Sequence, residues 1–212
     1  GDFERFMLKE IYEQPDTLRT CMQGRVDAVG SKIVLGGVAD FESEIVKAKR
    51  ILLLGQGTAL HAAMIGEYLF EGLAGIPTEV EFASEFRYRN PIVEEGTIAI
   101  AVSQSGETAD TIAALKEAQK HNIKTIGLVN VVGSTISRLV DGGIYLHSGQ
   151  EIGVASTKTF TSQLTVLYLL AIYLGRIKKT ISRKQAIEMM KDLELIPKLI
   201  NETYKENNHI RK

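Results

Sequence analysis

Short apolar runs and longer amphipathic segments alternate along most of the chain. Residues 50–57 (RILLLGQG) form an unbroken apolar run that ends in glycine, which is typical of a strand buried on both faces of a parallel sheet. Further strands are predicted at residues 78–84, 96–106, 124–130 and 142–148. Helical periodicity marks residues 58–75, 84–89, 107–121, 156–178 and 182–204. This alternation predicts an α/β fold, a three-layer α-β-α sandwich with a five-stranded, mostly parallel sheet of the flavodoxin-like type.

Helical spacing is also present before the first strand. It predicts a helix over residues 3–23, which Pro15 is expected to break, and a second helix over residues 41–49 after a glycine-bearing connector. Thr58 is a candidate N-cap for the helix that follows the first strand. The predicted division of the chain is an N-terminal helical segment at 1–40, a ligand-binding domain at 41–180 and a C-terminal helix at 181–212.

Composition and charge narrow the functions that the chain can have. The 212 residues are 44% hydrophobic, which is enough for one substantial core. The formal net charge is −1, and 25 Lys and Arg residues are scattered among 26 acidic residues, so the sequence gives no reason to expect a nucleic acid partner. The longest apolar stretch, residues 164–175, is about half as long as a membrane span, which favours a buried core helix and no membrane partner.

The cysteine and histidine residues of the sequence do not predict a metal site. Cys21 is the only cysteine, which excludes an internal disulfide and a multi-cysteine zinc site and fits a reducing cytosol. His61, His121 and His147 stand apart from carboxylates at ligand spacing. The N-terminus mixes charged and apolar residues, unlike a signal peptide. We therefore expect a cytoplasmic protein with no metal and no other cofactor.

Three loops rich in Gly, Ser and Thr follow predicted strands: GQGTAL, SQSGETAD and GQEIGVASTKT. Ligands of open parallel sheets bind beyond the carboxyl ends of the strands, where such loops converge. Glycines let backbone N–H groups approach an anion, helix N-termini carry partial positive charge, and hydroxyls add hydrogen-bond donors. A phosphate is therefore the ligand that these loops favour.

The loop SQSGETAD is the most specific of the three. It lacks the lysine of a P-loop, and GQGTAL has Leu60 where the dinucleotide fingerprint needs its third glycine. Helix capping would explain one of the hydroxyls of SQSGETAD but not all three. Glu107 and Asp110 would oppose a nearby anion, so phosphate binding requires both carboxylates to face elsewhere.

Four motifs in order, KEIYEQP, EFASEFRYR, SQSGETADT and EIGVASTKTFTSQLTVL, resemble the sugar isomerase (SIS) domain. The similarity covers residues 3–196 and is closest to the first of two SIS domains in the glutamine-fructose-6-phosphate aminotransferase family, the glucosamine-6-phosphate synthases. Members convert fructose 6-phosphate and glutamine to glucosamine 6-phosphate and glutamate. The resemblance implies phosphate binding by Ser103, Gln104, Ser105 and Thr108, helped by Gly57 and Thr58, and sugar contacts from Val154 and Ser156.

The chain departs from the family in two respects. The family usually has Cys-Gly-Thr-Ser in the first loop, whereas this chain has Gln56 and Ala59 at the outer positions, so one expected hydroxyl contact is absent. Complete synthases also contain a glutaminase domain and a second SIS domain that carries the catalytic base. The resemblance therefore implies a sugar-phosphate-binding part of a homodimeric transaminase, inactive alone and with no catalytic residue of its own. Glu107 and Glu151 match no family base.

Some alternatives stay open on the sequence. A stand-alone SIS module that senses a sugar phosphate and regulates a partner would carry the same phosphate loop. Arg87 and Arg89 could contact the phosphate, although alternating arginines and aromatics favour an interface with a neighbouring domain or subunit. Lys158 could attract the phosphate from a distance or be a plain surface lysine.

Overall fold

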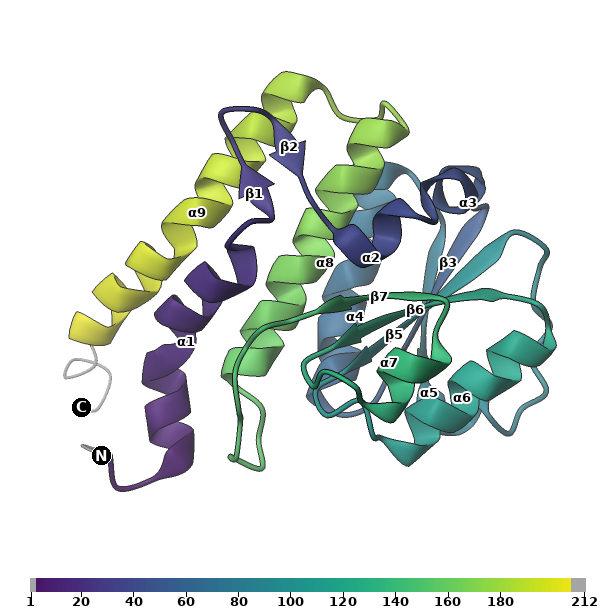
Figure 1. Cartoon of the computed structure of the whole chain (residues 1–212), viewed down its shortest axis with the longest axis horizontal. Helices are drawn as coiled ribbons and strands as arrows, with labels where there is room; N and C mark the ends of the chain where they lie inside the picture. Colours follow the sequence, from purple (N-terminus) through teal and green to yellow (C-terminus); the bar gives the residue numbers. More distant parts are fainter. Residues whose placement is uncertain (1–2, 207–212) are drawn as a thin grey trace.

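Five parallel strands form the central sheet of the computed structural model, which describes residues 3–206 (Figure 1). The strands are β3 (Arg50–Gly55), β4 (Thr78–Phe82), β5 (Thr97–Ser103), β6 (Lys124–Val129) and β7 (Gly142–Tyr145). Their order is β4-β3-β5-β6-β7, and every neighbouring pair is parallel. The predicted α/β fold is confirmed. The outermost parts of the predicted terminal segments, residues 1–2 and 207–212, lie outside the described residues.

Helices cover both faces of the sheet, and a small hairpin precedes it. The helices are α1 (Phe6–Met22), α2 (Gly36–Ala39), α3 (Glu42–Lys47), α4 (Thr58–Leu69), the π-helix η1 (Phe70–Ala74), α5 (Ala83–Phe86), α6 (Ala109–Lys120), α7 (Thr135–Leu139), α8 (Lys158–Ile177) and α9 (Arg183–Lys205). The hairpin pairs β1 (Val26–Asp27) with β2 (Lys32–Ile33) in antiparallel register.

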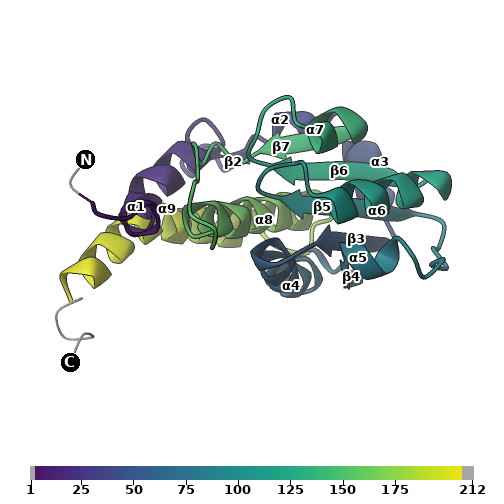
Figure 2. The same ribbon diagram turned by 90° about the horizontal axis from the view of Figure 1, so that it is seen from below.

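The strands alternate their side chains between two cores, as a pleated sheet requires. Ile51 and Leu53 of β3 pack in the larger core, with α4, α8 and the short helices α2 and α3. Leu52 and Leu54 face the other side, where α5 and α6 cover the sheet (Figure 2). All seven residues of the central strand β5 are buried, which explains why its sequence is one apolar run ending in Ser103.

Helix α8 lies in the core, as its apolar sequence predicts. Of the described helices it is the one long and apolar enough to cross a membrane, but 61% of that apolar window is buried inside the fold. Its other side joins α1 and α9, because Leu18, Leu169 and Leu193 share one apolar cluster. Helices α1 and α9 lie beyond α8, on its side away from the sheet, at the left of the view in Figure 1. The length and hydropathy of α8 are thus those of a core helix.

The predicted break at Pro15 is wrong, because α1 continues through it. A proline inside a helix removes the N–H that would bond to the carbonyl four residues earlier, here that of Ile11. The Ile11 carbonyl instead accepts hydrogen bonds from the Gln14 side chain (3.0 Å) and from the Tyr204 hydroxyl of α9. The tertiary contact with α9 therefore replaces the lost backbone bond, which a local pattern could not foresee.

Other differences from the sequence prediction are local. Helix α4 begins at Thr58, but Gly57 (φ +56°) occupies the N-cap position and no side chain caps it, so the predicted Thr58 cap is wrong. The hairpin, α2 and α7 were not predicted, since elements of two to five residues are too short to show a period.

Two glycine segments touch backbone to backbone where α2 packs on the edge strand β7. A Cβ atom on Gly37 would lie 1.9 Å from the carbonyl oxygen of Gly143, and one on Gly142 would lie 2.5 Å from the carbonyl oxygen of Gly37. Only residues without a side chain allow this approach. By contrast, a Cβ atom on the neighbouring Gly36 would have no atom within 4 Å.

We expect Gly37→Ala to lower the free energy of unfolding by about 1–3 kcal/mol, because the added methyl group must push α2 off β7. Gly36→Ala is the matched control: it has open space, and replacing a helical glycine by alanine should leave stability unchanged or raise it by up to about 1 kcal/mol. Urea unfolding of both variants measures the difference. Equal unfolding midpoints would contradict the backbone contact.

Candidate functional site

The candidate site lies at the carboxyl edge of the sheet, where loops follow β3, β5, β6 and β7. The first two loops are adjacent because β3 pairs with β5, and the Gln56 side chain of the first loop lies 3.5 Å from an Asp110 carboxylate oxygen of α6. Asn130 joins the others: its N–H donates to the Gln104 carbonyl (3.1 Å), and its side chain bonds to the backbone of Ser148 and Gly149. The sequence pattern predicts Asn130 only as the last residue of a strand. A polar side chain at the end of a buried strand could nevertheless have indicated a residue that links the loops.

The three hydroxyls of the second loop organise the turn between β5 and α6. The Ser103 hydroxyl accepts a hydrogen bond from the N–H of Gly106 (3.1 Å) and lies 3.3 Å from the Thr108 hydroxyl. The Ser105 hydroxyl accepts from the N–H of Glu107 (3.1 Å). Ser103 is buried, and Ser105 and Thr108 are half-buried. Because hydroxyl hydrogens rotate, the same groups can donate to an anion when one is bound.

Gly106 gives this turn its shape. Its φ is +67°, in the left-handed region that favours glycine, and a Cβ atom there would lie 2.1 Å from the Ser134 hydroxyl oxygen. Its carbonyl accepts a hydrogen bond from the N–H of Ile136 in α7 (3.0 Å). The turn is therefore fixed against α7, with its hydroxyls ahead of the N-terminus of the twelve-residue helix α6.

Both carboxylates of this loop region are held by other partners. Glu107 accepts a hydrogen bond from the N–H of Thr135 (2.8 Å), and this contact, with the charge of Arg138, lowers the pKa of Glu107. Asp110 forms an ion pair with Arg87 (2.7 Å). Each carboxylate therefore has a donor or a positive group beside it, which reduces the repulsion that it would exert on an anion.

The arginines of the EFRYR motif make contacts inside the chain. Arg87 pairs with Asp110, and its guanidinium also lies 4.5 Å from the centre of the Tyr88 ring. Arg89 pairs with Glu81 of β4. Arg87 therefore contacts the start of α6 through its ion pair with Asp110. An interface role for this motif stays a prediction.

In the first loop, Gly57 and Thr58 are exposed at the start of α4, and a Cβ atom on Gly57 would have no atom within 4 Å. Space is therefore available for a ligand above the backbone here. Ala59, where the family usually has a hydroxyl, is buried in the larger core. A methyl group at this position adds to the core beneath the loop.

The third loop, residues 146–157, is organised by Glu151. Its carboxylate accepts hydrogen bonds from the Ser156 hydroxyl (2.8 Å) and from the N–H groups of Thr157 (2.9 Å) and Thr159 (3.2 Å). Glu151 therefore caps the N-terminus of α8. Val154 is fully exposed in the same loop, and the hydroxyl bond of Ser156 stays within it. The structure thus places Val154 and Ser156 on a loop separate from the phosphate-loop hydroxyls.

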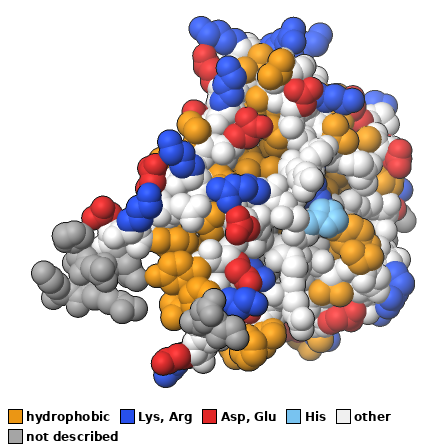
Figure 3. Space-filling view, turned by 60° about the vertical axis from the view of Figure 1, so that its left-hand side comes forward, with side chains coloured by type: hydrophobic (Ala, Val, Ile, Leu, Met, Phe, Trp, Pro, Cys, Tyr) orange, Lys and Arg blue, Asp and Glu red, His pale blue; other side chains and the backbone are white. Residues whose placement is uncertain are grey.

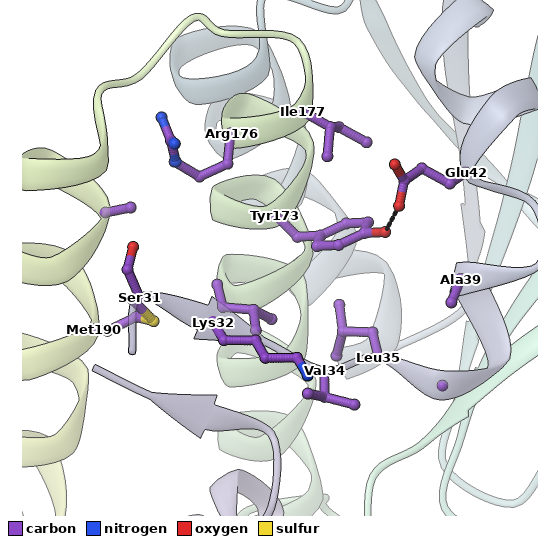
Figure 4. Close-up of a pocket in the computed structure, with 13 residues that line it drawn as sticks. Ser31, Lys32, Val34, Leu35, Ala39, Glu42, Tyr173, Arg176, Ile177 and Met190 are labelled. Atoms are coloured by element: carbon purple, nitrogen blue, oxygen red, sulfur yellow. Dashed lines mark hydrogen bonds between the residues drawn. The ribbon is translucent and has the colours of Figure 1, made fainter. Parts of the chain in front are cut away.

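A cleft of about 580 Å³ opens between the second and third loops, lined by Gln104, Asn130, His147 and residues 149–151 among others. A second cavity, of about 500 Å³, lies between the hairpin, α8 and α9, and Figure 4 shows Tyr173 and Glu42 meeting by a hydrogen bond inside it. That cavity contains none of the predicted site residues. Of the predicted site residues, Gln104 lines the first cleft, whereas the hydroxyls of the second loop are not among its lining residues.

Two further candidates, Cys21 and Lys158, are buried. Burial raises the pKa of the Cys21 thiol to about 11, so it stays protonated at neutral pH. Lys158 is 5% exposed and forms an ion pair with Glu13 (2.8 Å), so its interpretation as a plain surface lysine is wrong. Residues 3–206 contain no group of three or more His, Cys, Asp or Glu side chains placed to hold a metal ion.

Comparison with known proteins identifies the family of the chain. The family model of the SIS domain matches residues 44–173. The isomerising glutamine-fructose-6-phosphate aminotransferases of Bacteroides thetaiotaomicron and Chlorobaculum tepidum are 46% and 47% identical over 210 and 211 residues, 99% and 100% of this chain. The chain spans 34% of the length of each of these relatives.

Solved structures share the fold. The C-terminal domain of glucosamine-fructose-6-phosphate aminotransferase from Francisella tularensis superposes with a TM-score of 0.93 and 33% identity, covering 99% of this chain and 58% of that one. A phosphosugar isomerase structure from Clostridium difficile has a TM-score of 0.74 at 22% identity, over 92% of this chain and 52% of that chain. At that identity the second likeness supports the fold alone.

His147, which lines the cleft, is expected to titrate at low pH. Desolvation by its surroundings, and then the charge of Arg25, lower the pKa of His147 below 6.5. Protonation would place a positive charge beside that of Arg25, so the neutral imidazole should dominate at pH 7. A proton NMR titration of the imidazole should give a midpoint below 6.5, and Arg25→Gln should raise that midpoint. A midpoint at or above 6.5 would contradict this electrostatic picture.

Proposed function

We propose that this chain, which belongs to the SIS domain family, binds the phosphate of a hexose 6-phosphate in the loop between β5 and α6. The proposed phosphate ligands are Ser103, Gln104, Ser105 and Thr108, with Gly57 and Thr58 from the neighbouring loop. Val154 and Ser156 of the third loop contact the sugar in this proposal. The observation that carries it is the cluster of hydroxyls at the start of α6, whose two nearby carboxylates both have other partners.

A phosphate suits this loop because the available groups are donors with little fixed charge. The N-terminus of α6 carries partial positive charge, and the hydroxyls of Ser105 and Thr108 can rotate to donate. The Arg87–Asp110 ion pair removes the repulsion that an unpaired Asp110 would exert on a phosphate dianion. On the face drawn in Figure 3, charged side chains of both signs are interspersed. The proposed selectivity for phosphate rests on the donors of this loop.

The complete reaction that we propose is that of the aminotransferase relatives. It converts fructose 6-phosphate and glutamine to glucosamine 6-phosphate and glutamate, and this chain supplies the sugar-phosphate site. Similarity to these enzymes over 99–100% of the chain supports the assignment, although the chain spans 34% of their length. A glutaminase domain and a second SIS domain are the proposed partners within the whole enzyme. A homodimer and a cytoplasmic location stay predictions.

The described residues near the phosphate loop offer no ready carboxylate base. Isomerisation of a ketose to an aldose needs a base that moves a proton between adjacent carbons. Glu107 is engaged by the N–H of Thr135, and Glu151 by the N-terminus of α8, so both carboxylates already serve structural hydrogen bonds. We therefore propose that this chain binds the substrate and that the proton-moving residues come from other parts of the enzyme. The chain by itself would then bind hexose 6-phosphate without converting it.

Calorimetric titration tests the phosphate specificity. The protein should bind glucosamine 6-phosphate much more tightly than glucosamine, because the donors of the second loop contact the phosphate. Equal affinity for the two compounds, or binding of neither, would overturn the assignment.

Ser105→Ala tests the loop itself. It removes one hydroxyl donor to a charged group, so the affinity for glucosamine 6-phosphate should fall about 10- to 150-fold, equivalent to about 1.5–3 kcal/mol. Ser43→Ala is the control, because Ser43 lies exposed within α3 and its hydroxyl donates to the carboxylate of the neighbouring Glu44. Unchanged affinity in Ser105→Ala, with the fold intact by circular dichroism, would count against this site.

A further inference from the structure

The buried carboxylate of Glu10 connects the N-terminal helix α1 to the third loop. Glu10 is 3% exposed, and its oxygens accept hydrogen bonds from the N–H groups of Ile152 (2.6 Å) and Gly153 (3.1 and 3.2 Å). A buried carboxylate is stable only when its oxygens are paired in this way. Glu10 and Gly153 are 143 residues apart in the sequence, so this contact fixes two distant segments.

The loop is pressed closely against α1 at this point. A Cβ atom on Gly153 would lie 2.5 Å from a Glu10 carboxylate oxygen and 3.5 Å from the Cα atom of Met7. The φ angle of Gly153 is not positive, so its backbone conformation does not favour glycine. The close approach to Glu10 is the feature that favours glycine here. A side chain at position 153 would therefore displace either the Glu10 carboxylate or the loop from their present contact.

Two further contacts hold α1 in place around the loop. Glu13, one turn after Glu10, pairs with Lys158 at the first residue of α8 (2.8 Å). Arg25, which follows α1, donates to the carbonyl of Tyr145 at the end of β7. The helix is therefore attached both where the third loop begins and where it ends.

Glu10 and Glu151 together fix the backbone of the loop on both sides of Val154. Glu10 binds the N–H groups of residues 152 and 153, while Glu151 binds Ser156 and the backbone of Thr157. Val154 projects fully exposed from between these two attachments. A loop held at both ends presents Val154 and Ser156 in one arrangement, which reduces the entropy lost when a ligand binds.

We propose that Glu10 is a positioning residue for the sugar-contacting loop, so that α1 contributes to the site by holding this loop. This inference rests on the proposed function, in which Val154 and Ser156 contact the sugar. It assigns the specificity for the sugar to a contact between α1 and the third loop, and the affinity for the phosphate to the loop after β5.

Glu10→Gln tests the proposal, since glutamine has the same shape but only one acceptor oxygen for two N–H groups. Affinity for glucosamine 6-phosphate should fall about tenfold, the value of a lost charge-assisted hydrogen bond. Affinity for inorganic phosphate should stay within about twofold of the wild type, because the phosphate loop is untouched. Asp16→Asn is the matched control: it neutralises an exposed carboxylate of the same helix that pairs with Arg19, leaves the bonds to Ile152 and Gly153 in place, and should not separate the two affinities.

Gly153→Ala disturbs the same contact from the loop side and is the second variant, should Glu10→Gln fail to fold. It should give the same separation, with loss for the sugar phosphate and none for inorganic phosphate. Wild-type affinity for glucosamine 6-phosphate in either folded variant would overturn the proposal, as would an equal loss for both ligands, which indicates general disruption. If the wild type binds neither ligand, the proposed function fails as well, and that result is recognised without any variant.

Discussion

The site depends on how the structure pairs the carboxylates of Glu107 and Asp110 beyond the buried end of β5. Both sit at the N-terminus of α6, where the same partial positive charge that would attract a phosphate also attracts them. The N–H of Thr135 binds Glu107, and the Arg87 guanidinium binds Asp110. The hydroxyls of this loop therefore stay available for an anion. Without these two contacts the loop would carry two unpaired negative charges beside its ligand.

The sheet determines where the loops of the site lie, and residues of the surrounding helices form hydrogen bonds and ion pairs with these loops. The order β4-β3-β5-β6-β7 places the loops after β3 and β5 next to each other, and Asn130 after β6 extends the hydrogen bonding to the third loop. Arg87 follows α5, Thr135 begins α7 and Glu10 lies in α1. The residues proposed to touch the ligand are thus few, while those that hold them come from most of the chain.

Local patterns in the sequence are sufficient for the sheet and for the position of the loops. Buried parallel strands require continuous apolar runs, so 50–57 and 96–106 could be identified directly. The hydroxyls after the second run predict a phosphate-binding loop, and this role stays a prediction. Contacts between distant segments could not be predicted in this way. The helix passes through Pro15 because Tyr204 bonds to the Ile11 carbonyl, and Lys158 is buried because Glu13 pairs with it. Both depend on packing that has no local signature.

The central claim is that an anion binds the hydroxyl loop between β5 and α6. The most direct test is to follow the backbone amide signals of the protein by NMR while glucosamine 6-phosphate is added. The account predicts the largest and saturable shifts at residues 104–109, with smaller changes in the third loop and none around Tyr173 and Arg176 of the separate cavity. Shifts centred on that cavity, or none at residues 104–109, would contradict it.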